Sequence, residues 1–199
     1  MALALRAALG FVLGLALWRA GTPAYGRLLA DAAEPVLRLL ERPAATRLYA
    51  EGTRIAVDRA DFASRSERPS LPADDLTINV ILLLTLAATR KNLLKDYGIV
   101  ALGAALGALG LTHVAALVCA VKALYATQLG EWSAANYRPL SRELWTAASH
   151  FYRVAGCWAI AFGLWWGLLG PGFRAGAGRS GPPGPPRGGR RAFRRRGRG

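Results

Sequence analysis

The sequence predicts an all-α membrane protein with four transmembrane helices and a small extracytoplasmic insertion, a helix plus a β-hairpin, between the first two. Composition is the first observation: 53% of the 199 residues are hydrophobic, yet the formal net charge is +14. These values are compatible only if apolar and charged residues are segregated along the chain. They are segregated, because four apolar runs alternate with Arg-rich connectors.

The first run, Leu3 to Trp18, is interrupted only by Arg6 and can extend to residue 21. We expect residues 1–21 to form a retained transmembrane helix. A cleavable signal peptide is the alternative, since a short apolar core is followed by small residues and Pro23. Arg19, directly after the core, argues against easy cleavage.

Residues 22–74 are predicted to form the extracytoplasmic segment. Tyr25 to Glu41 has apolar residues at the i, i+3, i+4, i+7 spacing of an amphipathic helix, which Pro35 would bend or split. It would lie in the membrane interface or pack on the protein as a lid. Arg47 to Phe62 is predicted to be a β-hairpin with its turn at Glu51-Gly52. The polar segment from Ser64 to Pro72 is predicted to be a linker.

Residues 75–170 contain the other three runs: Leu76 to Thr89, Tyr97 to Val121, and Leu144 to Leu169. A span needs about 20 apolar residues to cross a hydrocarbon core of about 30 Å. The last two runs meet this length, whereas the first needs its flanking residues, tilt or local membrane thinning.

Basic residues in the short connectors predict the orientation. The loop from Arg90 to Asp96 has three basic residues against one acidic, and the last 29 residues have nine Arg and no acidic residue. Both should be cytoplasmic, which with four spans also places the N-terminus in the cytoplasm. We therefore expect a multi-pass protein of a bacterial inner membrane.

The tail, residues 171–199, is rich in Gly, Pro and Arg and should be a disordered basic segment. Because it directly follows a membrane span, we expect it to anchor the topology and to contact anionic lipid head groups. RNA binding is the less favoured alternative.

Several residues within the spans attract attention. Gly103 and Gly107, with Gly110 nearby, form a small-residue pattern typical of helix packing, within the chain or toward a partner. Polar groups in the membrane are costly and often functional, which singles out Asn79 and His113. Of the alternatives for His113, we favour a neutral hydrogen-bonded group over a ligand or proton carrier.

Arg153 lies about two turns into the last run. It could extend its side chain toward the membrane surface, or pair with Glu143 or Glu131 in a structural ion pair, which we favour. No disulfide framework, metal motif or cofactor fingerprint is present, and the only cysteines, Cys119 and Cys157, lie inside apolar runs.

A nucleophilic site is the sharper alternative. Cys119 and His150 fall near the same end of their spans, with Arg138 and Arg142 in the loop between them. A thiol, an imidazole and a guanidinium could act together as an intramembrane thiol transpeptidase or protease. The surroundings of Cys119 are those of an ordinary apolar helix, so a buried small hydrophobe is its expected role.

The layout resembles that of the small membrane proteins associated with exosortases, the sortase-like transpeptidases of bacterial membranes. The residues that carry this resemblance are the strand pair in Arg47 to Phe62, Ile78 to Leu84, Tyr125 to Gly130, Phe151 to Gly156, and Leu164 to Trp166. Residues 1–169 are covered, and the Pro/Gly/Arg tail departs from the pattern. The family has no fixed catalytic motif, so no catalytic residue is carried over.

The resemblance implies a non-enzymatic accessory protein that binds a membrane-embedded sorting or export enzyme, or its membrane-anchored substrate, at the cell envelope. Apart from the thiol enzyme, the remaining alternative is a small transporter or channel subunit. Only Asn79, Thr85, Thr112 and His113 are available to line its path.

Overall fold

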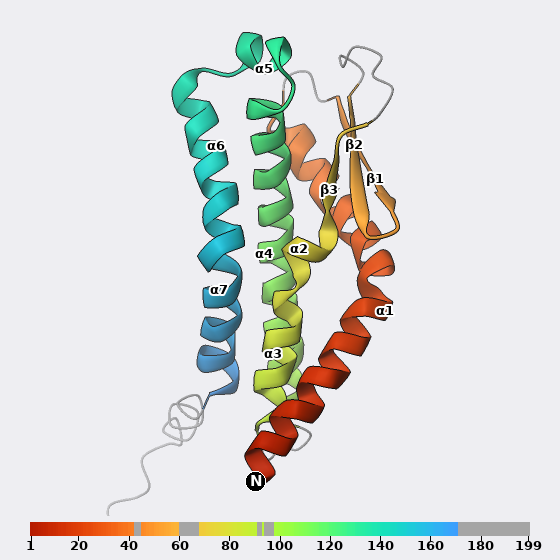
Figure 1. Ribbon diagram of the computed structural model, residues 1–199, viewed down its shortest axis with the longest axis vertical. Helices are drawn as coiled ribbons and strands as arrows, with labels where there is room; N and C mark the ends of the chain where they lie inside the picture. Colours follow the sequence, from red (N-terminus) through yellow and green to blue (C-terminus); the bar gives the residue numbers. More distant parts are fainter. Residues whose placement is uncertain (42–44, 60–67, 91–92, 94–97, 171–199) are drawn as a thin grey trace, which may run out of the picture.

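The computed structural model describes residues 1–41, 45–59, 68–90, 93 and 98–170. Long helices run side by side around a central helix, and a small sheet packs near one end (Figure 1). Met1 and the last described helical turn lie together at the opposite end. The predicted tail, residues 171–199, and most of the loop from Arg90 to Asp96 lie outside the described residues.

Helix α1 (Ala2–Leu39) is one continuous helix of 38 residues, about 57 Å long. The predicted division into a span ending at residue 21 and a separate amphipathic helix is therefore wrong. Both Pro23 and Pro35 lie inside the helix, and Figure 1 shows it changing direction along its length. A proline removes one backbone hydrogen bond and bends a helix. Contacts of α1 with α3, β1 and α4 keep this helix continuous.

The predicted hairpin is present as β1 (Thr46–Glu51) and β2 (Arg54–Arg59). Glu51 pairs with Arg54, so the turn is Gly52-Thr53 and not Glu51-Gly52. Gly52 has φ of 62°, which the first residue of a two-residue hairpin turn requires and glycine adopts without strain.

A third strand, β3 (Ser70–Pro72), pairs antiparallel with β2 and gives the order β1-β2-β3. It occupies the end of the segment that was predicted to be a linker, and that part of the prediction is wrong. The remaining residues of that segment up to 67 lie outside the described part of the chain.

The second apolar run forms two short helices, α2 (Ala73–Thr77) and α3 (Asn79–Ala88). The 10 residues of α3 cover about 15 Å, half of a hydrocarbon core. The third run forms α4 (Gly98–Thr127), a helix of 30 residues that continues past the predicted end at Val121.

The last described segment is a helical rod that is unbroken from residue 139 to 169. Its parts are α6 (Pro139–Phe151), the π-helical turn η1 (Tyr152–Gly156), α7 (Cys157–Leu164) and the π-helical turn η2 (Trp165–Leu169). The short helix α5 (Glu131–Asn136) connects α4 to this rod. The rod begins at Pro139, five residues before the predicted start at Leu144, because proline fits the first turn of a helix.

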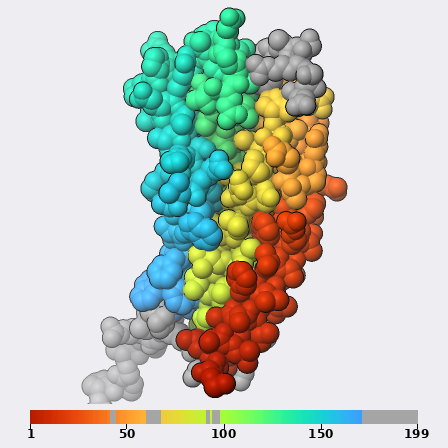
Figure 2. All heavy atoms as spheres, viewed as in Figure 1, coloured from red at the N-terminus to blue at the C-terminus, as the bar shows by residue number. Residues whose placement is uncertain are grey.

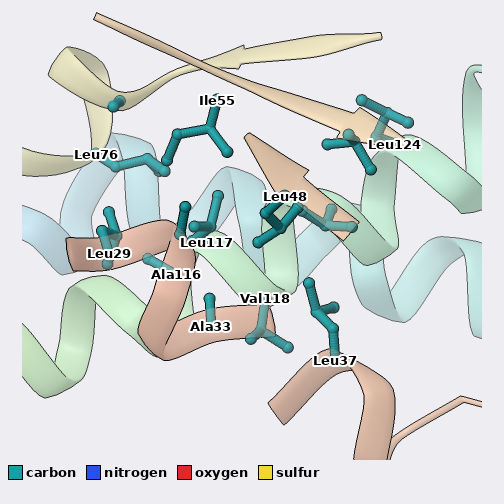
Figure 3. Close-up of a cluster of buried hydrophobic side chains, with 14 of the residues drawn as sticks. Leu29, Ala33, Leu37, Leu48, Ile55, Leu76, Ala116, Leu117, Val118 and Leu124 are labelled. Carbon is teal, nitrogen blue, oxygen red and sulfur yellow. The ribbon is translucent and has the colours of Figure 1, made fainter. Parts of the chain in front are cut away.

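Two hydrophobic cores divide the molecule. The first, which we call the cap core, joins α1 from Leu29 to Leu37, the sheet, and α4 from Ala116 to Leu124 (Figure 3). The second, the stem core, joins α3, the first half of α4, α7 and η2 through Leu83, Ala105, Leu109 and Ala161. We call the corresponding halves of the molecule the cap and the stem.

Two helices, α1 and α4, are long and apolar enough to cross a membrane. In the stem, the N-terminal half of α1 lies across α3, and Figure 2 shows the two side by side with α7 on the same face. A Cβ atom built on Gly10 would lie 2.5 Å from Cβ of Ala88, and one on Gly14 would lie 3.4 Å from Cβ of Leu84. These glycines therefore allow the backbones of α1 and α3 to approach closely.

Candidate functional site

A polar cavity of about 490 Å³ lies in the cap, between the ends of α1 and β2 and the helices α4, α5 and α6. We call it the cap cavity. The described residues of its wall include one carboxylate, Glu41, and three cationic residues, Arg59, Lys122 and Arg138. Aromatic side chains complete much of the wall, namely Trp132, Tyr137 and Trp145.

The carboxylate of Glu41 is the centre of a buried hydrogen-bonded cluster. Its Oε2 accepts a bond from the Thr46 hydroxyl at 2.5 Å and pairs with Arg59 Nη1 at 3.0 Å. Its Oε1 accepts a bond from Lys122 Nζ at 3.3 Å. All three charged side chains are less than a tenth exposed. Burying charges at this depth is tolerated only when each one has ionic and hydrogen-bonding partners.

Aromatic rings fix the positions of the cations in this cluster. The guanidinium carbon of Arg59 lies 5.5 Å from the ring centroid of Tyr125 and 5.3 Å from that of Trp132. The Tyr125 hydroxyl lies 2.8 Å from Thr46 Oγ1. Because the single Thr46 proton is directed to Glu41, Tyr125 must donate to Thr46. The rings therefore both orient Arg59 and extend the hydrogen-bond chain.

Tyr137, on the wall of the cap cavity, keeps its proton at neutral pH. Burial raises the pKa of Tyr137 to about 12, and the nearby Glu41 carboxylate adds to this while Arg59 opposes it. A neutral phenol can both donate and accept a hydrogen bond. The cap cavity therefore offers cationic, aromatic and hydroxyl groups to a polar ligand.

In the stem, neutral polar side chains form a chain across three helices. The Tyr25 hydroxyl lies 2.7 Å from His113 Nδ1, and His113 Nε2 lies 2.8 Å from Asn79 Oδ1. Asn79 Nδ2 donates to the carbonyl oxygen of Cys157 at 2.9 Å. A carbonyl only accepts, so the Asn79 amide orientation is fixed and its Oδ1 faces His113. His113 therefore carries its proton on Nε2, and Tyr25 donates to Nδ1.

An apolar cavity of about 320 Å³ lies beside this chain, between α1, α3 and α4. Tyr25 and His113 form part of its wall together with leucine side chains. Trp18, also on the wall, donates its indole N–H to Thr77 Oγ1 at 3.1 Å. The polar groups named here are bonded to one another, so the cavity presents a mainly apolar surface.

The structure places the predicted intramembrane polar residues in two different settings. Asn79 and His113, which sequence reasoning treated separately, are hydrogen-bonded to each other. Arg153 makes an ion pair, but its partner is Asp75 at 3.1 Å and neither Glu143 nor Glu131 as predicted. The pair is half exposed. The partner differs because α2 lies beside η1, which the sequence order does not reveal.

The predicted packing glycines do not pack inside the chain in the way expected. A Cβ atom on Gly103 or Gly107 would meet nothing within 4 Å, and both residues are exposed. Gly110 alone lies against a neighbour, with its Cβ position 3.5 Å from the Tyr25 hydroxyl. The close helix approach belongs instead to Gly10 and Gly14, which have the same four-residue spacing and could have been found by it.

The four residues of the thiol alternative lie in different environments. Cys119 is half-buried in α4 and His150 is exposed on α6. Within the described part of the chain, no hydrogen bond joins these two residues. Arg142 donates through Nε to the carbonyl oxygen of Tyr137 at 3.1 Å, and Arg138 lines the cap cavity. The arrangement does not bring the four together as one constellation, and thiol activity stays a prediction.

Sequence reasoning singled out Arg138, but only for the thiol alternative, and it missed the other charged residues described on the wall of the cap cavity, Glu41, Arg59 and Lys122. Glu41 and Lys122 are 81 positions apart, and each one falls at the edge of an apolar segment where a solvated charge is the ordinary expectation. The weak signal is the position of Lys122, directly after a long uncharged run with no turn before it. A charge inside the continuing helix needs a partner.

The described part of the chain contains no candidate metal site. No group of three or more His, Cys, Asp or Glu there could hold a metal ion. The side chains that do converge, in the cap cavity, are mainly nitrogen cations, which attract anions.

The chain matches no protein-family model, and no significantly similar curated protein or solved structure was found. The resemblance to exosortase-associated membrane proteins therefore rests on the sequence features alone. The physical arrangement of the cap and the stem has to carry the functional argument.

Proposed function

We propose that the protein is a non-enzymatic accessory subunit of the cell envelope that crosses the membrane four times and binds a second integral membrane protein. In this proposal, α1, the α2–α3 segment, α4 and the rod of residues 139–169 are the four crossings. The rod is about 46 Å long, ample for a span. The short α3 would cross the membrane together with α2, where the bilayer is locally thinned or the helices are tilted.

The direction of the helices supports cytoplasmic ends. Met1 and η2 lie at one end of the molecule, and the sheet and α5 lie toward the other (Figure 1). Gly10 lies against Ala88, so the end of α3, which the basic residue Arg90 follows, is near the start of α1 as well. The contact of Gly10 and Gly14 with α3 also favours retention of α1 over its cleavage. The cap would then face the outside of the cytoplasmic membrane.

The binding function is inferred from α6, an amphipathic helix whose apolar face points away from the rest of the molecule. In α6, no residue is buried, and the half-buried side chains facing the rest of the molecule are Ser141, Arg142, Trp145 and Ser149. The outward face carries Leu140, Leu144 and Phe151, each at least 62% exposed. A helix in water would turn these leucines inward. Their environment must therefore be apolar.

This apolar face continues along the whole rod. Val154, Trp158, Phe162 and Trp166 extend the stripe at helical spacing, all of them exposed. From Leu140 to Trp166 the stripe is about 39 Å long, which exceeds a hydrocarbon core of about 30 Å. Lipid tails cover only the part inside the core. A helix of an integral membrane partner, continuing out of the membrane, would cover all of it.

The partner class follows from the resemblance and the geometry together. A membrane-embedded sorting or export enzyme, or its membrane-anchored substrate, presents such a helix at the outer boundary of the membrane. The exposed Glu143, Thr146 and His150 lie on α6 beside the stripe, where they would make polar contacts with the extramembrane part of that helix. The stripe is therefore long, and polar side chains flank its outer end. An interface with another protein combines an apolar centre with a polar rim in this way.

The test is co-purification of the tagged protein from its native membrane in mild detergent. The variant Leu144→Arg places a charge in the stripe and should abolish recovery of the stoichiometric integral partner, because a buried unpaired charge opposes binding. The matched control, Thr53→Arg, places the same charge on an exposed residue of the hairpin turn, outside α6, and should leave recovery within about twofold. Purification of the wild type without an integral partner, or equal loss in both variants, would contradict the proposal.

A further inference from the structure

The charge balance of the cap cavity indicates its ligand. Among the described residues on its wall, three are cationic (Arg59, Lys122 and Arg138) and one is anionic (Glu41), a difference of two positive charges. Glu41 accepts bonds from Arg59, Lys122 and Thr46. A carboxylate has about four acceptor positions, so these bonds use most of its capacity.

The ammonium of Lys122 is held ready to bind rather than moving in solvent. Its Nζ donates one bond to Glu41 Oε1 and lies 5.9 Å from the ring centroid of Tyr125. An ammonium has three N–H donors, and its long side chain loses freedom when it is fixed in this way. Because the fold has already ordered and desolvated Lys122, an arriving anion would not have to do so.

The hydrogen-bonding groups around the cations fit an anion with several oxygen acceptors. Ser141 and Tyr137 supply hydroxyl groups to the wall, Asn136 an amide, and Arg138 an exposed guanidinium at the rim. A guanidinium pairs with phosphate through two parallel N–H bonds. Among the described residues of the wall, Glu41 is the carboxylate, and its ion pairs with Arg59 and Lys122 offset its repulsion of an anion that enters from the side of Arg138.

The surroundings of the cavity are suited to an amphiphile. Leu40 is part of its wall, and Leu39, which precedes it in the chain, is 87% exposed. Trp132 and Trp145 also line it, and indole rings are enriched where a membrane meets water. A ligand with an anionic head and an apolar body would contact both kinds of surface.

We propose that the cap cavity binds a phosphate group, presented as the head group of a membrane lipid or as a free phosphate. Arg138 and Lys122 would pair with the phosphate oxygens, and Tyr137 and Ser141 would complete its hydrogen bonds. This site is separate from the apolar stripe of α6, so it stands or falls independently of the binding partner proposed above.

The test measures binding by native mass spectrometry of the full chain released from detergent micelles. Three probes are compared: phosphatidic acid, zwitterionic phosphatidylcholine and inorganic phosphate. The variant Arg138→Glu reverses a charge at the exposed rim of the cavity, and we expect it to weaken phosphate binding about tenfold or more. The matched control is Arg47→Glu, an exposed arginine of β1 outside the cavity. The Arg-rich tail is present in both variants, so its non-specific attraction to lipid cancels.

Tight binding of phosphatidic acid that is lost in Arg138→Glu and kept in Arg47→Glu would support a lipid head group. The same pattern with inorganic phosphate would support free phosphate. Binding of neither phosphatidic acid nor inorganic phosphate, binding of phosphatidylcholine as tight as that of phosphatidic acid, or equal weakening in the two variants would overturn the proposal. Thermal melting establishes that each variant is folded, and Arg138→Gln, with a smaller expected loss, replaces Arg138→Glu if the reversal prevents folding.

Discussion

The cap and the stem bury their polar groups in different ways. In the stem, the hydrogen-bonded chain from Tyr25 through His113 to Asn79 is formed by side chains without a formal charge. The cap instead buries three formal charges, those of Glu41, Arg59 and Lys122, within hydrogen-bond distance of one another.

One helix connects these two environments. His113 and Lys122 both lie on α4, nine positions apart, and both are buried. An uncharged imidazole is tolerated where lipid surrounds the helix, whereas an ammonium needs a counter-ion held by surrounding protein. Under the topology proposed above, the boundary between the membrane and the cap would lie between these residues on α4, and the buried charges lie in the half that contains the polar cavity.

The largest expected effect comes from removing the counter-ion of the cap. In Glu41→Ala, the buried Arg59 and Lys122 lose the carboxylate between them, and the free energy of unfolding should fall by about 3–5 kcal/mol. The double variant Glu41→Ala, Lys122→Met should recover part of this loss, because one of the two buried cations is gone. Reversible unfolding in detergent measures both.

The control for this comparison is Glu143→Ala, which removes an exposed carboxylate from α6. It should change the free energy of unfolding by less than about 0.5 kcal/mol. If Glu41→Ala is as mild as Glu143→Ala, the charged cluster does not hold the cap together, and the distinction between the two halves fails.

Alanine substitutions at two glycines test the packing of the stem. We expect smaller effects on the free energy of unfolding, with opposite signs at the two positions. Gly10→Ala puts a methyl group 2.5 Å from Ala88 Cβ and should destabilise the protein by about 1–3 kcal/mol. Gly103→Ala fills open space and should stabilise α4 by about 0.5–1 kcal/mol, since alanine loses less entropy in a helix. The same unfolding measurement compares the two variants.

A destabilising effect at Gly103 similar to that at Gly10 would mean that Gly103 is covered by a partner, as the sequence pattern alone allows. Equal and small effects at both positions would show instead that α1 does not lie against α3 as described.

Local signals account for the parts of the fold that the sequence could predict. The uncharged run in α4 and the hairpin around Gly52 depend on residues close in the chain, and both are present. The first helix was expected to end at residue 21 and Pro35 to bend or split a separate helix, but α1 is continuous from Ala2 to Leu39. Strand β3 was missed because its pairing with β2 depends on contacts across a connection and has no local signal.

The candidate site was less predictable for a related reason. Each charged residue of the cap cavity has an ordinary solvated interpretation, and only the fold brings Glu41 to Lys122 across 81 positions. In the stem, the cost of a polar group in lipid singled out His113 and Asn79, although not their contact or Tyr25. Arg153 was expected to form an ion pair, and its partner, Asp75, came from an element whose position was not foreseen.

The most direct test of the account is the side of the membrane on which each half lies. In a variant with Cys119 and Cys157 replaced by alanine, single cysteines are introduced as Thr53→Cys in the hairpin turn and Ala2→Cys at the start of α1; both positions are exposed. An impermeant maleimide added to intact cells should label Thr53→Cys directly and Ala2→Cys only after permeabilisation. Labelling of both residues from the outside, or of Ala2→Cys alone, would contradict an outward cap and cytoplasmic ends.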